Sequence, residues 1–154
     1  MAATVLVVAR APGCRETLLV PPLTVEEATA LEEALLLDTL EACRAEVPAT
    51  ALLYADQEEA VALGLLAGPE TQLVLQEGRG LADALRFGIA RHVAEGPVAV
   101  VAADIPGVPA GSLERAFAEL DGGADVVLGP ALDGGYWLIA MSEFSDAPFR
   151  SIPW

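Results

Sequence analysis

The stretch Pro-Val-Ala-Val-Val-Ala-Ala-Asp-Ile-Pro-Gly, residues 97–107, carries the strongest indication of the fold. Residues 98–103 are all apolar and rich in valine, a pattern typical of a central strand that is covered on both faces. The apolar run ends at Asp104, and the turn-forming pair Pro106-Gly107 follows. The segment therefore predicts a buried strand with a carboxylate at its carboxyl end.

Strand-like and helix-like segments alternate on both sides of this strand. The expected strands span residues 4–9, 51–55, 72–75, 124–128 and 136–141, and the expected helices span residues 25–46, 57–66, 81–94 and 112–120. Because this alternation is typical of βαβ crossovers, we expect one domain over residues 1–154, a three-layer α/β/α fold with a mostly parallel, mixed sheet. Ligands of such sheets bind at the carboxyl ends of the strands.

The first expected helix has a clear start. Thr24 and Glu27 have the spacing of a capping box, in which each side chain accepts a hydrogen bond from the other residue's backbone amide. Leu31, Ala34, Leu35 and Asp38 then share one mostly apolar face.

Composition narrows the class of protein. Hydrophobic residues make up 54% of the 154 residues and charged residues 20%, which favours a packed core over disorder. Apolar runs of about six residues are far shorter than the ~20 that a membrane helix needs. The amino-terminal strand also lacks the basic region of a signal peptide. We therefore expect a cytoplasmic protein that does not associate with membranes.

The charge pattern excludes several chemistries. The formal net charge is −15, and all eight basic residues are arginines. The absence of lysine excludes Schiff-base catalysis and a lysine clamp on phosphate, and the acidic balance argues against a nucleic-acid partner. Cys14 and Cys43 lie far apart without CxxC spacing, so neither a zinc site nor a disulfide framework is indicated.

Two aspartates are candidate metal ligands. Asp104 follows the most buried strand, where a carboxylate can hold Mg²⁺ or Mn²⁺ beside substrate phosphates; the alternative is a turn or helix-capping aspartate. Asp133 opens a loop with Gly134, Gly135 and Tyr136 and can share the cation or act as a base; the alternative is a plain hairpin loop.

Arginines in two further loops are candidate anion contacts. The loop after the first strand contains Arg10, Ala11, Pro12, Gly13 and Arg15, whose amides and guanidinium groups can meet the phosphates of a nucleotide. Arg79 lies between Gly78 and Gly80 at a helix start, which suits either an anion contact or a turn.

Three segments together resemble a known family. They are Arg-Ala-Pro-Gly at 10–13, Ala-Asp-Ile-Pro at 103–106, and Asp-Val-Val-Leu-Gly-Pro-Ala-Leu-Asp-Gly-Gly-Tyr-Trp-Leu-Ile at 125–139. With Phe149, Ile152, Pro153 and Trp154, they are similar to the bacterial glycosyltransferase-like family often labelled radical-SAM/selenodomain-associated transferase. Its relatives are the phospholactate and molybdenum-cofactor guanylyltransferases. The similarity extends over nearly the whole chain.

The resemblance implies a nucleotide-diphospho-sugar transferase (GT-A) fold. It also implies a nucleotide in the loop after the first strand, a divalent metal at Asp104, and an acceptor side at Gly134, Gly135 and Tyr136. Family members carry Lys-Thr-Arg-Leu shortly after Pro-Gly, where this chain has Glu16 and Leu18 in place of both cations. Typical members also continue past the Ile-Pro-Trp at which this sequence stops, so we expect the last helix to be missing.

Two functions remain open at this point. The first is a metal-dependent nucleotidyl- or glycosyltransferase that uses a nucleoside triphosphate or a nucleotide sugar. The second is a degenerate, non-catalytic binding or assembly protein that has lost the phosphate-binding cations. Aromatic residues near the carboxyl end, Trp137, Phe144, Phe149 and Trp154, further predict an apolar edge and a homodimer.

Overall fold

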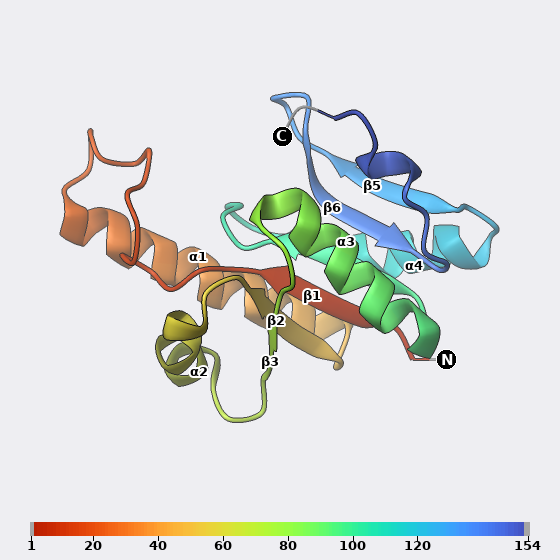
Figure 1. Ribbon diagram of the computed structural model, residues 1–154, viewed down its shortest axis with the longest axis horizontal. Coiled ribbons are helices and arrows are strands. Elements are labelled where there is room, and N and C mark those ends of the chain that lie inside the picture. Colours follow the sequence, from red (N-terminus) through yellow and green to blue (C-terminus); the bar gives the residue numbers. More distant parts are fainter. Residues whose placement is uncertain (1, 153–154) are drawn as a thin grey trace.

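The computed structural model describes residues 2–152 and contains one six-stranded sheet (Figure 1). The strands are β1 (Thr4–Val8), β2 (Thr50–Tyr54), β3 (Gln72–Leu75), β4 (Val98–Ala102), β5 (Val126–Pro130) and β6 (Tyr136–Met141). The helices are α1 (Val25–Glu46), α2 (Ala60–Ala67), α3 (Gly80–His92) and α4 (Ser112–Asp121), with 3₁₀ turns η1 (Gln57–Glu59), η2 (Val93–Glu95) and η3 (Ala147–Phe149).

The strand order is β3-β2-β1-β4-β6-β5. Strand β1 pairs in parallel with β2 and β4, and β2 pairs in parallel with β3, whereas β6 is antiparallel to both β4 and β5. The predicted mixed, mostly parallel sheet is confirmed. Because Val101 of β4 lies opposite Leu138 of β6, the carboxyl end of β4 and the amino end of β6 meet at one edge of the sheet.

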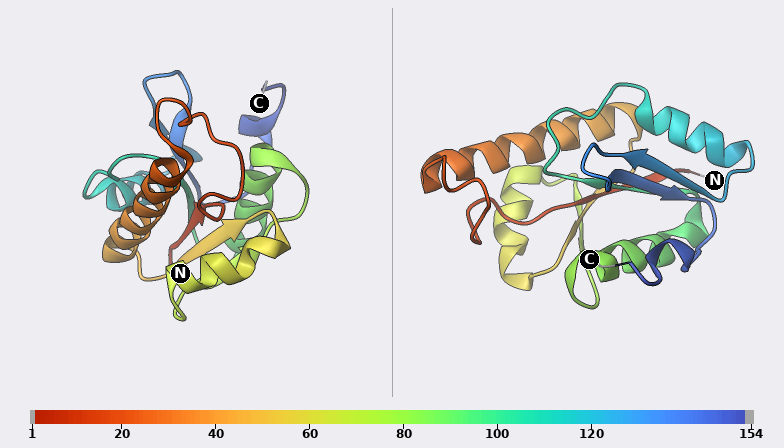
Figure 2. Two further views of the ribbon diagram at one scale, coloured as in Figure 1. Left: turned by 90° about the vertical axis from the view of Figure 1, so that its left-hand side faces the viewer. Right: turned by 90° about the horizontal axis from the view of Figure 1, so that it is seen from above.

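Helices cover both faces of the sheet, as the sequence predicts (Figure 2). Alternate residues of the central strands point to opposite layers. On one face, Val5 and Val7 of β1 pack with residues of α1, α2 and α4, and on the other Leu6 packs with residues of α3 and with Phe149. The residues of both layers are almost fully buried.

Helix α1 begins with the predicted capping box. The Glu27 amide donates to the Thr24 hydroxyl at 3.2 Å, and the Thr24 amide donates to the Glu27 carboxylate at 2.8 Å. The face that the helix buries is not the predicted one around Leu31 and Asp38. Its buried residues are Ala28, Leu36, Thr39, Leu40 and Cys43.

Strand β5 starts two residues later than the sequence predicts, at Val126. The reason is the way α4 ends. Gly123 adopts a positive φ of 103°, and the Ala124 amide donates to the Glu119 carbonyl at 3.0 Å. The helix end therefore uses the backbone that the sequence pattern assigns to the strand.

Gly88 allows α3 to lie directly on the sheet. A Cβ atom at this position would lie 2.8 Å from Leu6 Cδ1 and 3.0 Å from Leu53 Cδ2, and both leucines are fully buried. We expect Gly88→Ala to lower the free energy of unfolding by roughly 1–2 kcal/mol, because overpacking outweighs the gain in helix propensity. Gly64→Ala in α2, where the nearest atom is 3.5 Å away, is expected to raise it by up to about 1 kcal/mol. Urea unfolding of both variants tests the contrast, and equal effects would contradict it.

The described carboxyl-terminal segment packs back onto the chain itself. Phe149 is buried against α3, and Asp146 pairs with Arg86 at 2.8 Å and with Arg150 at 3.0 Å. Of the aromatic residues behind the homodimer prediction, Phe144 is exposed, Trp137 packs against the chain's own core, and Trp154 lies outside the described residues. The homodimer stays a prediction. Among residues 2–152, no helix combines the length and apolar character that a bilayer-spanning helix requires.

Candidate functional site

A cleft of about 660 Å³ opens at the carboxyl ends of β1, β2, β3 and β4. Its wall brings together three of the predicted site residues, Arg10, Arg15 and Asp104. The loops that supply them lie toward the left-hand side of Figure 1. Apolar side chains complete much of the wall, among them Leu18, Leu19, Leu35, Leu36, Leu81 and Ala84.

The loop after β1 is built on a tight turn. The Cys14 amide donates to the Ala11 carbonyl at 3.2 Å, with Pro12 and Gly13 at the two central positions. Proline followed by a glycine with φ of 72° is typical of a type II turn. A Cβ atom on Gly13 would lie 2.7 Å from Thr29 Oγ1, so glycine also permits the loop to pack on α1.

The Glu59 carboxylate lies beneath this loop and holds it in place. Its Oε2 accepts a hydrogen bond of 2.6 Å from the Ala11 amide, and its Oε1 lies 3.4 Å from Cys14 Sγ and 3.6 Å from Arg15 Nη2. The Glu59 side chain is only 8% exposed. A buried carboxylate with three partners ties η1 to the loop across 48 residues of sequence.

A second carboxylate, from α1, holds the same loop from the other side. Glu32 Oε2 accepts a hydrogen bond of 2.9 Å from the Gly13 amide, and Glu32 Oε1 lies 3.7 Å from Arg10 Nη2. Two amides that the sequence assigns to ligand phosphates thus already donate to carboxylates of the chain. The nucleotide-contacting roles of Arg10, Ala11, Pro12, Gly13 and Arg15 stay predictions.

The charge of the cleft is close to balanced and slightly negative. Its wall carries two arginines, Arg10 and Arg15, and three carboxylates, those of Glu32, Glu59 and Asp104. Arg15 also lies 3.9 Å from Asp56. Because a nucleotide brings several negative charges, the wall by itself offers little net attraction for it.

Asp104 is exposed in the turn that follows β4, on the wall of the cleft. Among residues 2–152, no hydrogen bond or ion pair engages its carboxylate. The carboxylate that caps the next helix, α4, belongs to Glu46, which accepts bonds from the amides of Gly111, Leu113 and Glu114 at 2.8–3.1 Å. Asp104 is therefore available to bind a ligand.

The metal-binding role of Asp104 stays a prediction, because the described residues form no ready-made metal centre. No group of three or more acidic, histidine or cysteine side chains within residues 2–152 is arranged to hold a metal ion. Mg²⁺ is commonly held by one or two carboxylates together with substrate phosphates and waters. Asp104 suits that arrangement, in which the substrate supplies most of the ligands.

The β5–β6 hairpin loop lies at the same edge of the sheet as Asp104, because β6 pairs with β4. Its Asp133 carboxylate accepts a hydrogen bond of 2.9 Å from the Gly135 amide, and Gly134 adopts a positive φ of 92°. None of residues 133–136 is on the wall of the cleft in the described part of the chain. The metal, catalytic and acceptor roles of Asp133, Gly134, Gly135 and Tyr136 stay predictions.

The start of α3 forms another part of the wall. The Arg79 amide donates to Asp83 at 2.7 Å, as in a plain helix start, while its exposed side chain is not on the wall. Gly80 lines the cleft, and its carbonyl accepts a bond of 3.2 Å from the buried Gln76 amide group. The role of Arg79 as an anion contact stays a prediction.

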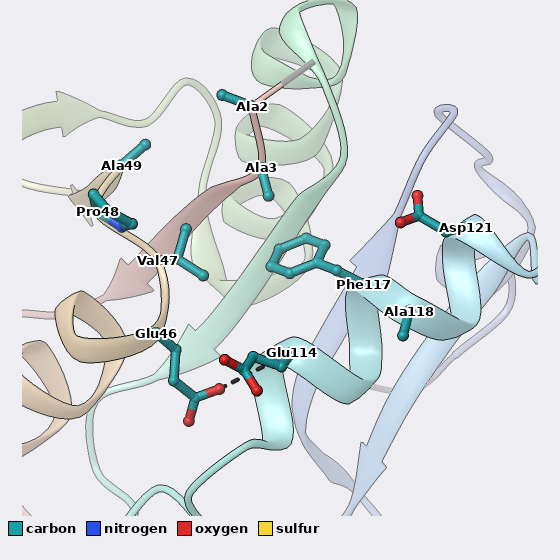
Figure 3. Close-up of a pocket in the computed structure, with 10 residues that line it drawn as sticks. All are labelled: Ala2, Ala3, Glu46, Val47, Pro48, Ala49, Glu114, Phe117, Ala118 and Asp121. Atoms are coloured by element: carbon teal, nitrogen blue, oxygen red, sulfur yellow. Dashed lines mark hydrogen bonds between the residues drawn. The ribbon is translucent and has the colours of Figure 1, made fainter.

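A second hollow, of about 490 Å³, lies at the opposite end of the sheet (Figure 3). It lies between the carboxyl end of α1 and α4, with Phe117 beside Val47 and Ala3. Its Glu46 carboxylate already accepts three backbone amides of the chain. Because ligands of mostly parallel sheets bind at the other end of the strands, the first cleft is the candidate functional site.

The two cysteines are expected to differ in reactivity. Burial raises the pKa of the Cys43 thiol to about 12. Partial burial also raises the pKa of the exposed Cys14 thiol, and the hydrogen bond to Glu59 raises it further. We expect iodoacetamide to modify Cys14 alone in the folded protein, and Glu59→Gln to accelerate that reaction at pH 8 by removing a negative charge. Mass spectrometry of the labelled protein, with an unfolded control, measures both effects. Labelling of Cys43 in the folded protein would contradict the first expectation, and an unchanged rate at Cys14 in Glu59→Gln would contradict the second.

Comparisons with known proteins agree with the fold. A family described as "Uncharacterized protein conserved in bacteria (DUF2064)" matches residues 39–154. A candidate nucleotide-diphospho-sugar transferase from Desulfovibrio desulfuricans G20 is similar in structure, with a TM-score of 0.84 and 24% identity over 100% of this chain and 70% of that one. Comparison with curated protein sequences gives no significant match.

Two more distant structures share the fold. Mannose-1-phosphate geranyltransferase from Thermus thermophilus matches with a TM-score of 0.57 and 26% identity, over 83% of this chain and 41% of that one. A candidate glucose-1-phosphate thymidylyltransferase from Bacillus anthracis matches with a TM-score of 0.56 and 10% identity, over 99% and 76% of the two chains. The chain thus has the fold of the nucleotide-diphospho-sugar transferases and belongs to the bacterial DUF2064 family.

Proposed function

We propose that this chain is a metal-dependent nucleotidyl- or glycosyltransferase domain that binds a nucleoside triphosphate or a nucleotide sugar in the cleft. The single observation that carries the proposal is the meeting of Arg10, Arg15 and the unengaged Asp104 on one wall at the carboxyl ends of the parallel strands. Cationic groups and a free carboxylate at this edge are what a phosphate-bearing donor and a divalent cation need.

The similar structures support the same class of reaction. Their names describe transferases, and the Thermus thermophilus protein is 26% identical to this chain. This chain covers only 41% of that protein, so its particular substrate is not carried over. The donor is therefore proposed as a class: a nucleotide whose phosphates lie toward Arg15 and Asp104.

The residues of the chain have separate tasks in this proposal. In nucleotidyl transfer, an acceptor oxygen bonds to the α-phosphorus while the bond to the β-phosphate oxygen breaks and pyrophosphate leaves with the electron pair. Arg10 and Arg15 would stabilise the charge on the leaving group. Asp104 would hold Mg²⁺ or Mn²⁺, which neutralises phosphate charge when bound. Asp133, on the acceptor-side loop with Gly134, Gly135 and Tyr136, would take the acceptor proton.

A second candidate function follows from the state of the loop after β1. The Ala11 and Gly13 amides donate to Glu59 and Glu32, and both arginines lie within 3.9 Å of a carboxylate. These contacts favour a non-catalytic binding or assembly protein that keeps the fold without a working phosphate site. The two functions differ in whether a nucleotide binds at all.

Thermal unfolding with a panel of ligands distinguishes the two functions. The panel contains nucleoside triphosphates and nucleotide sugars, each tested with Mn²⁺ and with a chelator. A ligand at 100 times its dissociation constant stabilises the folded state by about 2.7 kcal/mol. We expect a rise in melting temperature that requires both the nucleotide and Mn²⁺. No rise with any member of the panel would favour the non-catalytic protein.

A further inference from the structure

We propose that Glu32 and Glu59 are specificity-determining residues that make the loop after β1 reject free phosphate groups. The inference rests on the proposed function, because it concerns how the phosphates of a donor meet this loop. Glu32 and Glu59, which sequence patterns do not single out, would then select which form of phosphate binds in the cleft. The consequence is a cleft that favours phosphates already paired with a divalent cation.

Two backbone amides of the loop after β1 already donate to carboxylates of the chain. The amides of Ala11 and Gly13 donate to carboxylate oxygens at 2.6 Å and 2.9 Å, distances typical of strong bonds to a charged acceptor. Both acceptors come from elements outside the loop, Glu59 from η1 and Glu32 from α1. The bond of the Gly13 amide to Glu32 is exposed, so Glu32 stands where a ligand oxygen could otherwise accept it, whereas the Ala11 amide is buried with Glu59 beneath the loop.

The same two carboxylates also lie beside the arginines of the cleft. Glu59 Oε1 lies 3.6 Å from Arg15 Nη2, and Glu32 Oε1 lies 3.7 Å from Arg10 Nη2. An incoming phosphate would share each guanidinium group with a carboxylate. Because like charges within ~4–6 Å disfavour one another, a bare phosphate is repelled from the groups that should attract it.

The carboxylates of the cleft repel a phosphate less strongly when the phosphate is paired with a divalent cation. Pairing with a divalent cation cancels much of the phosphate charge and so reduces its repulsion by Glu32 and Glu59. Asp104, on the same wall and without a partner among residues 2–152, is free to contact the cation. Glu32, Glu59 and Asp104 therefore all favour a phosphate that is paired with a divalent cation.

Glu32 offers the cleaner test, because it lies on α1 at the edge of the cleft while Glu59 is buried beneath the loop. Glu33 provides a matched control: it is the next residue of the same helix, it is exposed, and it does not line the cleft. Glu32→Gln removes the charge and leaves an oxygen for the Gly13 amide. Glu32→Ala removes the charge and also frees the amide.

The experiment is calorimetric titration of inorganic pyrophosphate at constant ionic strength in the presence of a chelator. We expect weak binding to the wild-type protein and to Glu33→Gln and Glu33→Ala. Affinity should rise in the order wild type, Glu32→Gln, Glu32→Ala, with a total gain of roughly tenfold. The same series titrated with pyrophosphate and Mn²⁺ should show a smaller gain, because the wild-type cleft already accepts the complex.

Two results would overturn the inference: equal affinity of the Glu32 and Glu33 variants, or no pyrophosphate binding to any variant. Urea unfolding of each variant shows whether a change in affinity reflects a change in fold. The result is separable from that of the proposed function. Stronger chelator-resistant binding in the Glu32 variants, with no nucleotide-dependent stabilisation of the wild type, would support the inference and contradict the transferase. Nucleotide-dependent stabilisation of the wild type, with no stronger chelator-resistant binding in the Glu32 variants, would support the transferase and contradict the inference.

Discussion

An Asp104→Asn variant is expected to lose about 10- to 100-fold in Mn²⁺-dependent nucleotide affinity and to unfold at the same urea concentration as the wild type. The carboxylate lies on the wall of the cleft, and within residues 2–152 it has no structural partner that the change would break. Charge-assisted contacts contribute about 1.5–3 kcal/mol each, which corresponds to this loss of affinity. Calorimetric titration of the nucleotide in excess Mn²⁺ measures the effect.

Asp121→Asn is the matched control for this change. Asp121 ends α4, it is exposed, and it lines the hollow at the other end of the sheet. The substitution removes the same charge from the chain, so it reports any effect of net charge on nucleotide affinity. An equal loss in the two variants would show a general effect of net charge and no metal contact by Asp104. A destabilised Asp104→Asn variant with unchanged metal affinity would show that Asp104 is a structural turn residue.

A Glu59→Ala variant is expected to lose roughly 2–3 kcal/mol of unfolding free energy. The change leaves the Ala11 amide buried without its acceptor and removes the nearer of the two carboxylates beside Arg15. An unsatisfied buried donor costs about 1–3 kcal/mol, and the cavity left by the side chain adds to this. Urea unfolding measures the loss of stability.

Glu58→Ala supplies the comparison for Glu59. Glu58 is the preceding residue of η1, and its side chain is exposed. We expect a change within about 0.5 kcal/mol, as for most surface substitutions. Similar stabilities of the two variants would mean that the contacts of Glu59 with the loop contribute little to the folded state.

Much of the fold can be predicted from local patterns. The apolar run at 98–103 and its end at Asp104 correspond to β4 and the turn after it, and the Thr24–Glu27 pair marks the start of α1. These features depend on residues that are close in sequence. The order of the strands depends instead on pairing between distant segments. Strand β6 lies between β4 and β5, and no local pattern specifies that pairing.

The contacts of the site, like the strand order, can be predicted only in part from local sequence. Arg10, Arg15 and Asp104 were predicted because they follow strands, and strands of a parallel sheet end at one edge. Glu59 and Glu32 were missed because their partners lie 48 and 19 residues away. One signal was present: the acidic segment Asp56–Glu59 follows β2, the neighbour of β1 in the sheet. Local sequence does not show which of its acids is buried beneath the loop.

The most direct test is to locate bound Mn²⁺ by its paramagnetic broadening of backbone amide signals in the nitrogen-15-labelled protein, with a nucleotide that stabilises it. If the cleft is a metal-dependent nucleotide site, broadening should centre on residues 103–105 and reach residues 10–15, and it should disappear in Asp104→Asn. Broadening spread over exposed acidic residues such as Glu26 and Glu41 of α1, with the cleft signals unchanged, would contradict a metal-dependent site in this cleft.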